Sequence, residues 1–150
     1  MSNLPHLYKL LKLYSDFEKD ENSENFLDVL EKIVSKNDPS SIPILFSYFD
    51  DKSDYTWIME SIMLALENYE INSFLKEFLK GLSDFIKISP LRSKGLLYAI
   101  LNHDSYMHVF SQNMHLADKE SLLKLFDLMQ KESPNHVELI TELRRELNSK

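Results

Sequence analysis

The sequence predicts an all-α protein, and three features support that fold class. Apolar residues recur at intervals of three and four along nearly the whole chain, as at Tyr55, Ile58 and Ile62, which places them on one face of a helix. Only two glycines occur in 150 residues, so few positions suit the positive φ angles of hairpins and phosphate-binding loops. Three of the five prolines follow Ser or Asp, a pairing typical of helix starts.

Capping residues and prolines predict where the helices begin and end. Ser89 and Ser133 each place a capping hydroxyl before a proline that suits the first helical turn. Asp38 gives the same signal, although a second proline four residues after the first allows that helix to begin at Ser41. Asp118 is expected to cap a later helix. The nine expected helices are Leu4–Phe17, Glu24–Ser35, Pro39–Tyr48, Asp54–Asn68, Ile71–Lys87, Pro90–Leu101, Ser105–Asn113, Lys119–Glu132 and Pro134–Leu147.

The spacing of these helices predicts how they pack. The connections are short, so successive helices are expected to be antiparallel within a single domain over residues 1–150. Helix starts recur about every 15 to 17 residues, which indicates an irregular HEAT-like α-solenoid. No sequence self-similarity accompanies that period, and a compact helical bundle remains the alternative.

Charge and composition restrict the partners of the chain. A net charge of −7 disfavours nucleic acid and anionic membranes and favours a basic protein partner. The first residues lack the charged and apolar regions of a signal peptide, and the longest apolar stretches are too short to span a bilayer. We therefore expect a cytoplasmic protein.

The sequence carries none of the motifs that would indicate an enzyme. There is no cysteine, no glycine-rich phosphate loop and no Gly-x-Ser-x-Gly motif. The five histidines include no pair at the i, i+4 spacing of a zinc helix, although His108 and His115 would share a face if one helix contained both. Asp50 and Asp51 are interpreted as a solvated turn. We expect no catalytic residues, no metal site and no cofactor.

The best candidate for a partner-binding surface is an acidic segment that contains aromatic residues. Tyr55 fits the apolar stripe of its helix, whereas Trp57 lies off that stripe and is the better interface residue. The nearby aspartates have an alternative interpretation as capping and solubilising groups. A second cluster of aromatic and polar residues lies at a later helix junction. The predicted partner-binding residues are Asp50, Asp51, Asp54, Trp57, Glu60, Tyr98, Asn102, Asp104 and Tyr106.

Several stretches between Asp38 and Phe110 resemble the immunity protein 30 family: Ile42–Leu45, Asp50–Tyr55, Met59–Ile62, Leu66–Tyr69, Ser89-Pro90 and Leu96–Asn102. The resemblance implies a small bacterial helical protein encoded beside a polymorphic or contact-dependent growth inhibition toxin. Such a protein neutralises its cognate toxin by binding it, and no catalytic residue is implied. Many of these toxins are nucleases with basic substrate sites, which an acidic inhibitor would complement.

Two other functions remain open from the sequence. A HEAT-like scaffold or adaptor within a larger complex would have the same composition. A small helical enzyme whose carboxylates leave no motif is the third hypothesis, and bound metal or turnover would be needed to support it.

Overall fold

A computed structural model describes residues 3–149, which form α-helices and two 3₁₀ turns but no strand. Helices make up 76% of the structure, and this confirms the all-α prediction. Contacts divide the chain into two compact units, unit 1 over residues 1–70 and unit 2 over residues 71–150. The HEAT-like arrangement and the single domain stay predictions. Within residues 3–149, no helix combines the length and apolarity needed to cross a bilayer.

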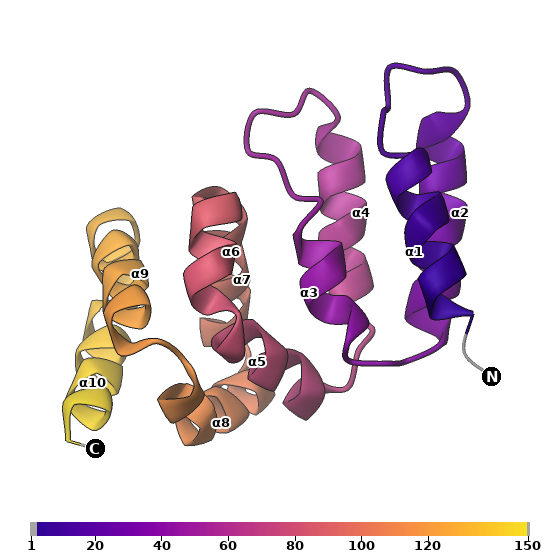
Figure 1. Ribbon diagram of the computed structural model, residues 1–150. Coiled ribbons are helices and arrows are strands. Elements are labelled where there is room, and N and C mark those ends of the chain that lie inside the picture. The colour runs from indigo at the N-terminus through magenta and orange to yellow at the C-terminus, as the bar shows by residue number, and fades with distance from the viewer. Residues whose placement is uncertain (1–2, 150) are drawn as a thin grey trace. The chain divides into compact units, whose positions relative to one another are not determined.

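Unit 1 consists of two helix pairs that pack side by side. The helices are α1 Leu4–Leu13, α2 Asn22–Ser35, α3 Ser41–Phe46 and α4 Thr56–Leu66. Helix α1 runs opposite to α2, α3 runs opposite to α4, and α2 packs against α4 (Figure 1). Phe26 and Ile33 on α2 and Ile58 and Ile62 on α4 are fully buried because they repeat on the inner face of each helix.

Unit 2 contains six α-helices around a second core. They are α5 Ile71–Lys80, α6 Leu82–Ile88, α7 Pro90–Leu101, α8 Asp104–Asn113, α9 Lys119–Glu132 and α10 Val137–Asn148, with 3₁₀ turns at Met114–Leu116 and Pro134–His136. Helix α5 packs against α8, α6 packs against α7 and α9, and α10 packs against α9. Phe78, Leu97, Phe110 and Phe126 are fully buried in this core.

Two of the predicted caps are present. The Ser89 hydroxyl accepts a hydrogen bond from the Arg92 backbone N–H at 3.1 Å, and the Asp118 carboxylate accepts one from Ser121 at the same distance. The Ser121 hydroxyl and N–H hold the pKa of Asp118 below its usual value. The Ser133 hydroxyl instead bonds a histidine ring, and a 3₁₀ turn precedes the last helix.

The expected helix Ile71–Lys87 is divided at Gly81 into α5 and α6. The two parts bury their apolar faces against different neighbours, α8 for the first and α7 with α9 for the second. At this break Gly81 lets the Phe85 ring pack closely against the backbone, because a Cβ there would be 2.6 Å from the ring Cζ. This break accounts for ten α-helices in residues 3–149 where nine were expected.

We predict that Phe78→Ala lowers the free energy of unfolding by about 3 to 5 kcal/mol. The Phe78 ring is fully buried and stacks between Phe74 and Phe85, with centroids 6.1 and 6.2 Å away. Urea denaturation measures the loss, with Leu13→Ala as the control because Leu13 is 65% exposed and should change stability by about 0.5 kcal/mol or less. A loss under about 1 kcal/mol for Phe78→Ala would contradict the observed packing.

We also predict that Gly81→Ala destabilises the protein by about 1 to 3 kcal/mol, because the new methyl group overlaps the buried Phe85 ring. Helix propensity alone would predict the opposite effect, a gain in stability of about 1 kcal/mol from replacing glycine by alanine. A double-mutant cycle with Phe85→Leu should show that the cost of the alanine falls when the ring is removed. A neutral or stabilising Gly81→Ala would show that the ring does not restrict this position.

Candidate functional site

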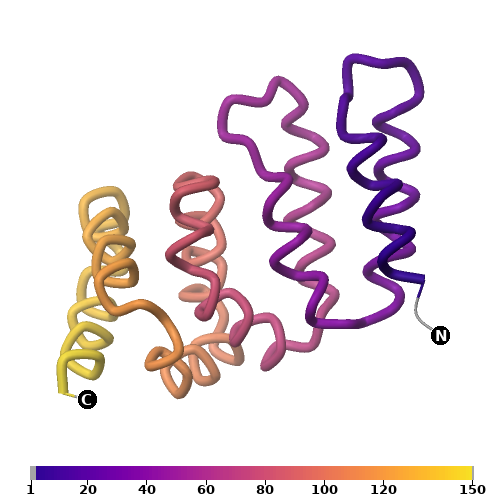
Figure 2. Tube along the Cα trace, in the orientation of Figure 1, coloured from indigo at the N-terminus to yellow at the C-terminus, as the bar shows by residue number. Residues whose placement is uncertain are grey.

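The candidate site lies on two loops at one end of unit 1. Residues 14–21 connect α1 to α2, and residues 47–55 connect α3 to α4. Because the two helix pairs run side by side in the same sense, both loops emerge at the same end, as the Cα trace shows (Figure 2). Residues more than 30 positions apart therefore form one surface. We call these two segments the acidic loop face.

Aromatic rings join the two loops beneath this surface. The Phe17 ring contacts Phe26 on α2 and Tyr55 on the second loop, with centroids 5.0 and 5.4 Å apart. Tyr48 packs edge-on against Phe26 at 5.5 Å, and burial raises the pKa of its hydroxyl. Phe17 was expected inside the first helix, but that helix ends at Leu13. The contacts of Phe17 with Phe26 and Tyr55 explain why α1 ends before Phe17. The spacing of apolar residues along a single helix cannot reveal such distant partners.

Hydrogen bonds within the second loop fix its path. The Asp50 carboxylate accepts a bond from the Lys52 backbone N–H at 3.0 Å, and the Ser53 hydroxyl accepts one from Tyr55 at 3.1 Å. The Ser53 N–H donates to the Asp50 carbonyl at 3.1 Å. Asp50 thus forms a turn of the kind that Asp favours, which agrees with the capping alternative for this residue.

The first loop is held in a similar way. The Asn22 side chain donates to the Asp16 carbonyl at 2.9 Å, and the Ser15 hydroxyl donates to the Lys12 carbonyl at 2.6 Å. Glu21 has a φ of 67°, a left-handed conformation that is uncommon for a residue with a side chain. The loop therefore holds Glu21 in a conformation that a free chain would seldom adopt.

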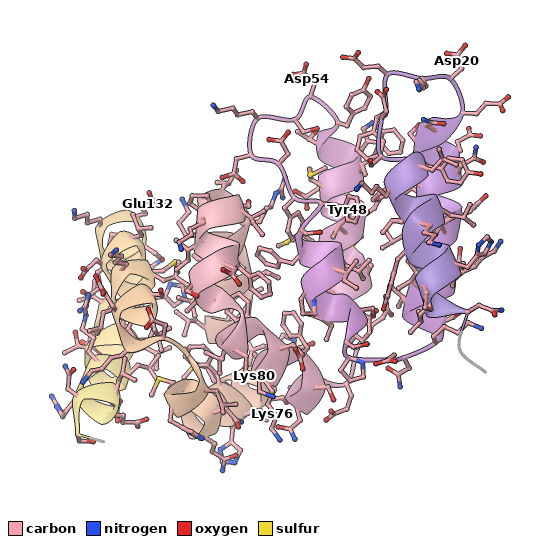
Figure 3. All side chains as sticks on the ribbon, viewed as in Figure 1. Asp20, Tyr48, Asp54, Lys76, Lys80 and Glu132 are labelled. Atoms are coloured by element: carbon pink, nitrogen blue, oxygen red, sulfur yellow. The ribbon has the colours of Figure 1, made fainter. Side chains whose placement is uncertain are left out.

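Negative charge is concentrated on the acidic loop face. Figure 3 shows Asp20 and Asp54 on the two loops, at the same end of unit 1. The face has five more carboxylates than lysines, against a net charge of −7 for the whole chain. Every one of its carboxylate residues is exposed. They are Asp16, Glu18, Asp20, Glu21, Asp50, Asp51 and Asp54, and the lysines are Lys19 and Lys52.

A cleft of about 330 Å³ lies between the loops. It places the predicted residues Asp50 and Asp54 beside Asp16 and Glu18, which the sequence prediction missed because they lie on the other loop. Beyond the cleft, Trp57 opens α4 with 49% of its surface exposed, and Glu60 is exposed one turn later. The other residues that line the cleft between the two loops are Ser15, Phe17, Tyr48, Ser53, Tyr55 and Met59.

The second predicted cluster lies in unit 2, where its members make structural contacts. His136, which is 8% exposed, bonds the Asn102 side-chain oxygen through Nε2 at 2.9 Å and the Ser133 hydroxyl through Nδ1 at 2.7 Å. The Tyr98 ring packs edge-on against the same imidazole at 4.9 Å. Asn102 and Tyr98 therefore help to join α7 to the turn before α10, a contact that no local sequence pattern could predict.

The other two members of this cluster, Asp104 and Tyr106, lie in the first turn of α8. Tyr106 is half-buried and packs against Phe74 and His103, with centroids 6.4 and 5.4 Å away. Asp104 is exposed in the first helical turn, where a carboxylate complements the helix dipole. Each of the two residues thus has a structural role in unit 2.

The acidic and histidine side chains that could in principle bind a metal lie apart from one another. Among residues 3–149, no three His, Asp or Glu side chains are placed to hold a metal ion together. His108 and His115 would share a face only if one helix contained both. Helix α8 ends at Asn113, so the two histidines belong to different elements.

Comparison with known proteins places these features in a family. The family model described as immunity protein 30 matches residues 14–110, almost two thirds of the chain. The match begins at the acidic loop face and includes α2, α3 and α4, so it extends further toward the N-terminus than the resemblance that begins at Asp38. No curated protein and no solved structure matches the chain. The chain belongs to the immunity protein 30 family.

Proposed function

We propose that this protein neutralises a cognate bacterial toxin domain by binding it stoichiometrically through the acidic loop face, with no catalytic step. The observation that carries the proposal is the concentration of exposed carboxylates on two loops within the region that the family model matches. Family membership supports the role of an immunity protein. The surface, the chemistry of the partner and the mode of inhibition are our inference.

The charge of the surface favours a basic partner such as a nuclease toxin. A nuclease must attract phosphates, so its substrate site is basic, and an acidic loop face would cover such a site by mimicking the charge of the substrate. Exposed charges also act over about 10 Å at 0.1 M salt, which steers the two proteins together before they touch. Rapid association benefits an inhibitor that must bind its toxin before damage occurs.

The aromatic part of the surface would supply affinity at short range. Trp57 is half exposed beside the charged loops, and tryptophan is enriched among residues that dominate interface energies. The rings of Phe17 and Tyr55 contact each other and hold the two loops of the acidic loop face together. A surface held in place before binding loses less conformational entropy on association.

We predict a kinetic difference between a charge variant of the acidic loop face and an aromatic variant beside it on α4. Asp54→Asn should slow association with the toxin domain and flatten its salt dependence, because long-range attraction sets the encounter rate. Trp57→Ala should instead speed dissociation about 30-fold, the equivalent of about 2 kcal/mol, because the ring acts only in contact. Association and dissociation rates at two salt concentrations separate the two effects.

The matched control for charge is Glu142→Gln, which removes one exposed carboxylate from α10 of unit 2. It should leave the rates close to those of the parent, and melting temperatures should show that all three variants fold. If Asp54→Asn and Trp57→Ala bind like the parent, the interface is neither the acidic loop face nor the start of α4 beside it.

The function itself is tested by co-expression with the C-terminal toxin domain of a large exported protein, whose gene we expect immediately upstream. We expect a stable one-to-one complex and protection of cells that produce the toxin domain. A toxin domain that remains active and elutes separately would contradict the proposal.

A further inference from the structure

An open groove of about 330 Å³ lies between α2 and α4 of unit 1, on the side of α4 that Trp57 shares. Leu27, Leu30 and Val34 line it from α2, and Leu64 and Ala65 line it from α4. Leu64 is 62% exposed, so most of its side chain is in contact with water. The groove lies wholly within the region that the family model matches.

The groove continues the surface that carries Trp57. Trp57 and Leu64 are seven residues apart on α4, which places them on the same side of the helix about 10 Å apart. Both side chains are largely exposed. Together with the half-buried Ser61 between them, they form a mostly apolar stripe that leads from the acidic loop face into the groove.

Carboxylates border this apolar stripe on both sides. Glu31 lines the groove from α2. Glu24 and Asp28 are exposed on the same side of that helix, seven and three residues before it. Glu67, also exposed, flanks Leu64 on α4. Lys32 lies one turn after Asp28 on the same side of α2, further from the groove than Glu31, and partly offsets the charge of Asp28. The groove is therefore apolar at its centre and acidic at its rim.

We propose that this groove binds a basic amphipathic helix of the toxin domain; the inference rests on the proposed function and adds the contact that would fix the toxin's orientation. Such a helix would have apolar residues at i, i+3, i+4 and i+7 facing the groove and Lys or Arg on its flanks. The stretch from Trp57 to Asn68 is about 16 Å long, which suits three helical turns.

Charge argues against a second copy of this chain as the occupant. The chain carries a net charge of −7, and a copy in the groove would bring further carboxylates against Glu24, Asp28 and Glu31. Like charges held this close repel and destabilise the contact. A basic segment of another protein gains from the same rim.

The test compares Leu64→Arg with Leu128→Arg in the full chain, using the purified C-terminal domain of the upstream exported protein as the probe. Both variants add one positive charge, but Leu128 is 37% exposed on α9 of unit 2. We expect Leu64→Arg to weaken binding about 30-fold or more and Leu128→Arg to leave it close to the parent value. Leu64→Ala, which adds no charge, should give a smaller loss in the same direction.

The outcomes separate this inference from the proposed function. If the parent binds the toxin domain and both Leu64 variants bind equally well, the groove inference is wrong and the proposed function stands. If the parent does not bind the domain at all, both are wrong. Sedimentation velocity supplies the remaining outcome: parent dimers that Leu64→Arg separates would place a second copy in the groove and overturn the inference.

Discussion

The contact between α2 and α4 determines where every candidate surface of unit 1 lies. Phe26 and Ile33 of α2 and Ile58 and Ile62 of α4 are all fully buried where the two helices pack. Removing a large apolar side chain from such a core costs several kcal/mol, so the positions of the helices are strongly specified. Because α2 and α4 run in the same sense, the loops that precede them meet at one end and the groove runs along their length.

Electrostatics opposes this arrangement. The acidic loop face gathers most of the excess negative charge of the chain on two short loops, where the carboxylates repel one another. Stability alone would favour a more even distribution of charge. Glu21 adds a left-handed backbone conformation, which usually costs about 1 kcal/mol or more. Features that cost stability without improving the core are typical of functional surfaces, because binding compensates for them only in the complex.

The elements of this fold that depend on local sequence could be predicted. Helix α7 begins where Ser89 and its proline indicate, and α9 begins after Asp118, because each cap acts within one turn. The exposure of Trp57 follows from its place off the apolar stripe of α4. The burial of Phe78 and Leu82 follows from the spacing of three and four residues between apolar side chains in that part of the chain.

The features that the sequence did not predict depend on residues distant in the chain. The bend at Gly81 arises because α5 and α6 pack against different helices, and α1 ends early because Phe17 contacts Tyr55. The cleft, likewise, combines two loops whose pairing no local pattern reveals. Tyr98 and Asn102 were singled out as polar and aromatic residues at a junction, and only their contacts with His136 show how they are held.

Amide hydrogen exchange of the protein with and without the toxin domain shows directly whether the acidic loop face and the groove bind the toxin, since it locates the binding surface without any substitution. We expect the toxin to slow exchange in residues 14–21 and 47–60 and along the groove faces of α2 and α4. Exchange in residues 98–106 should stay unchanged. Protection confined to residues 98–106, with the two loops of unit 1 unaffected, would show that the toxin binds unit 2 instead.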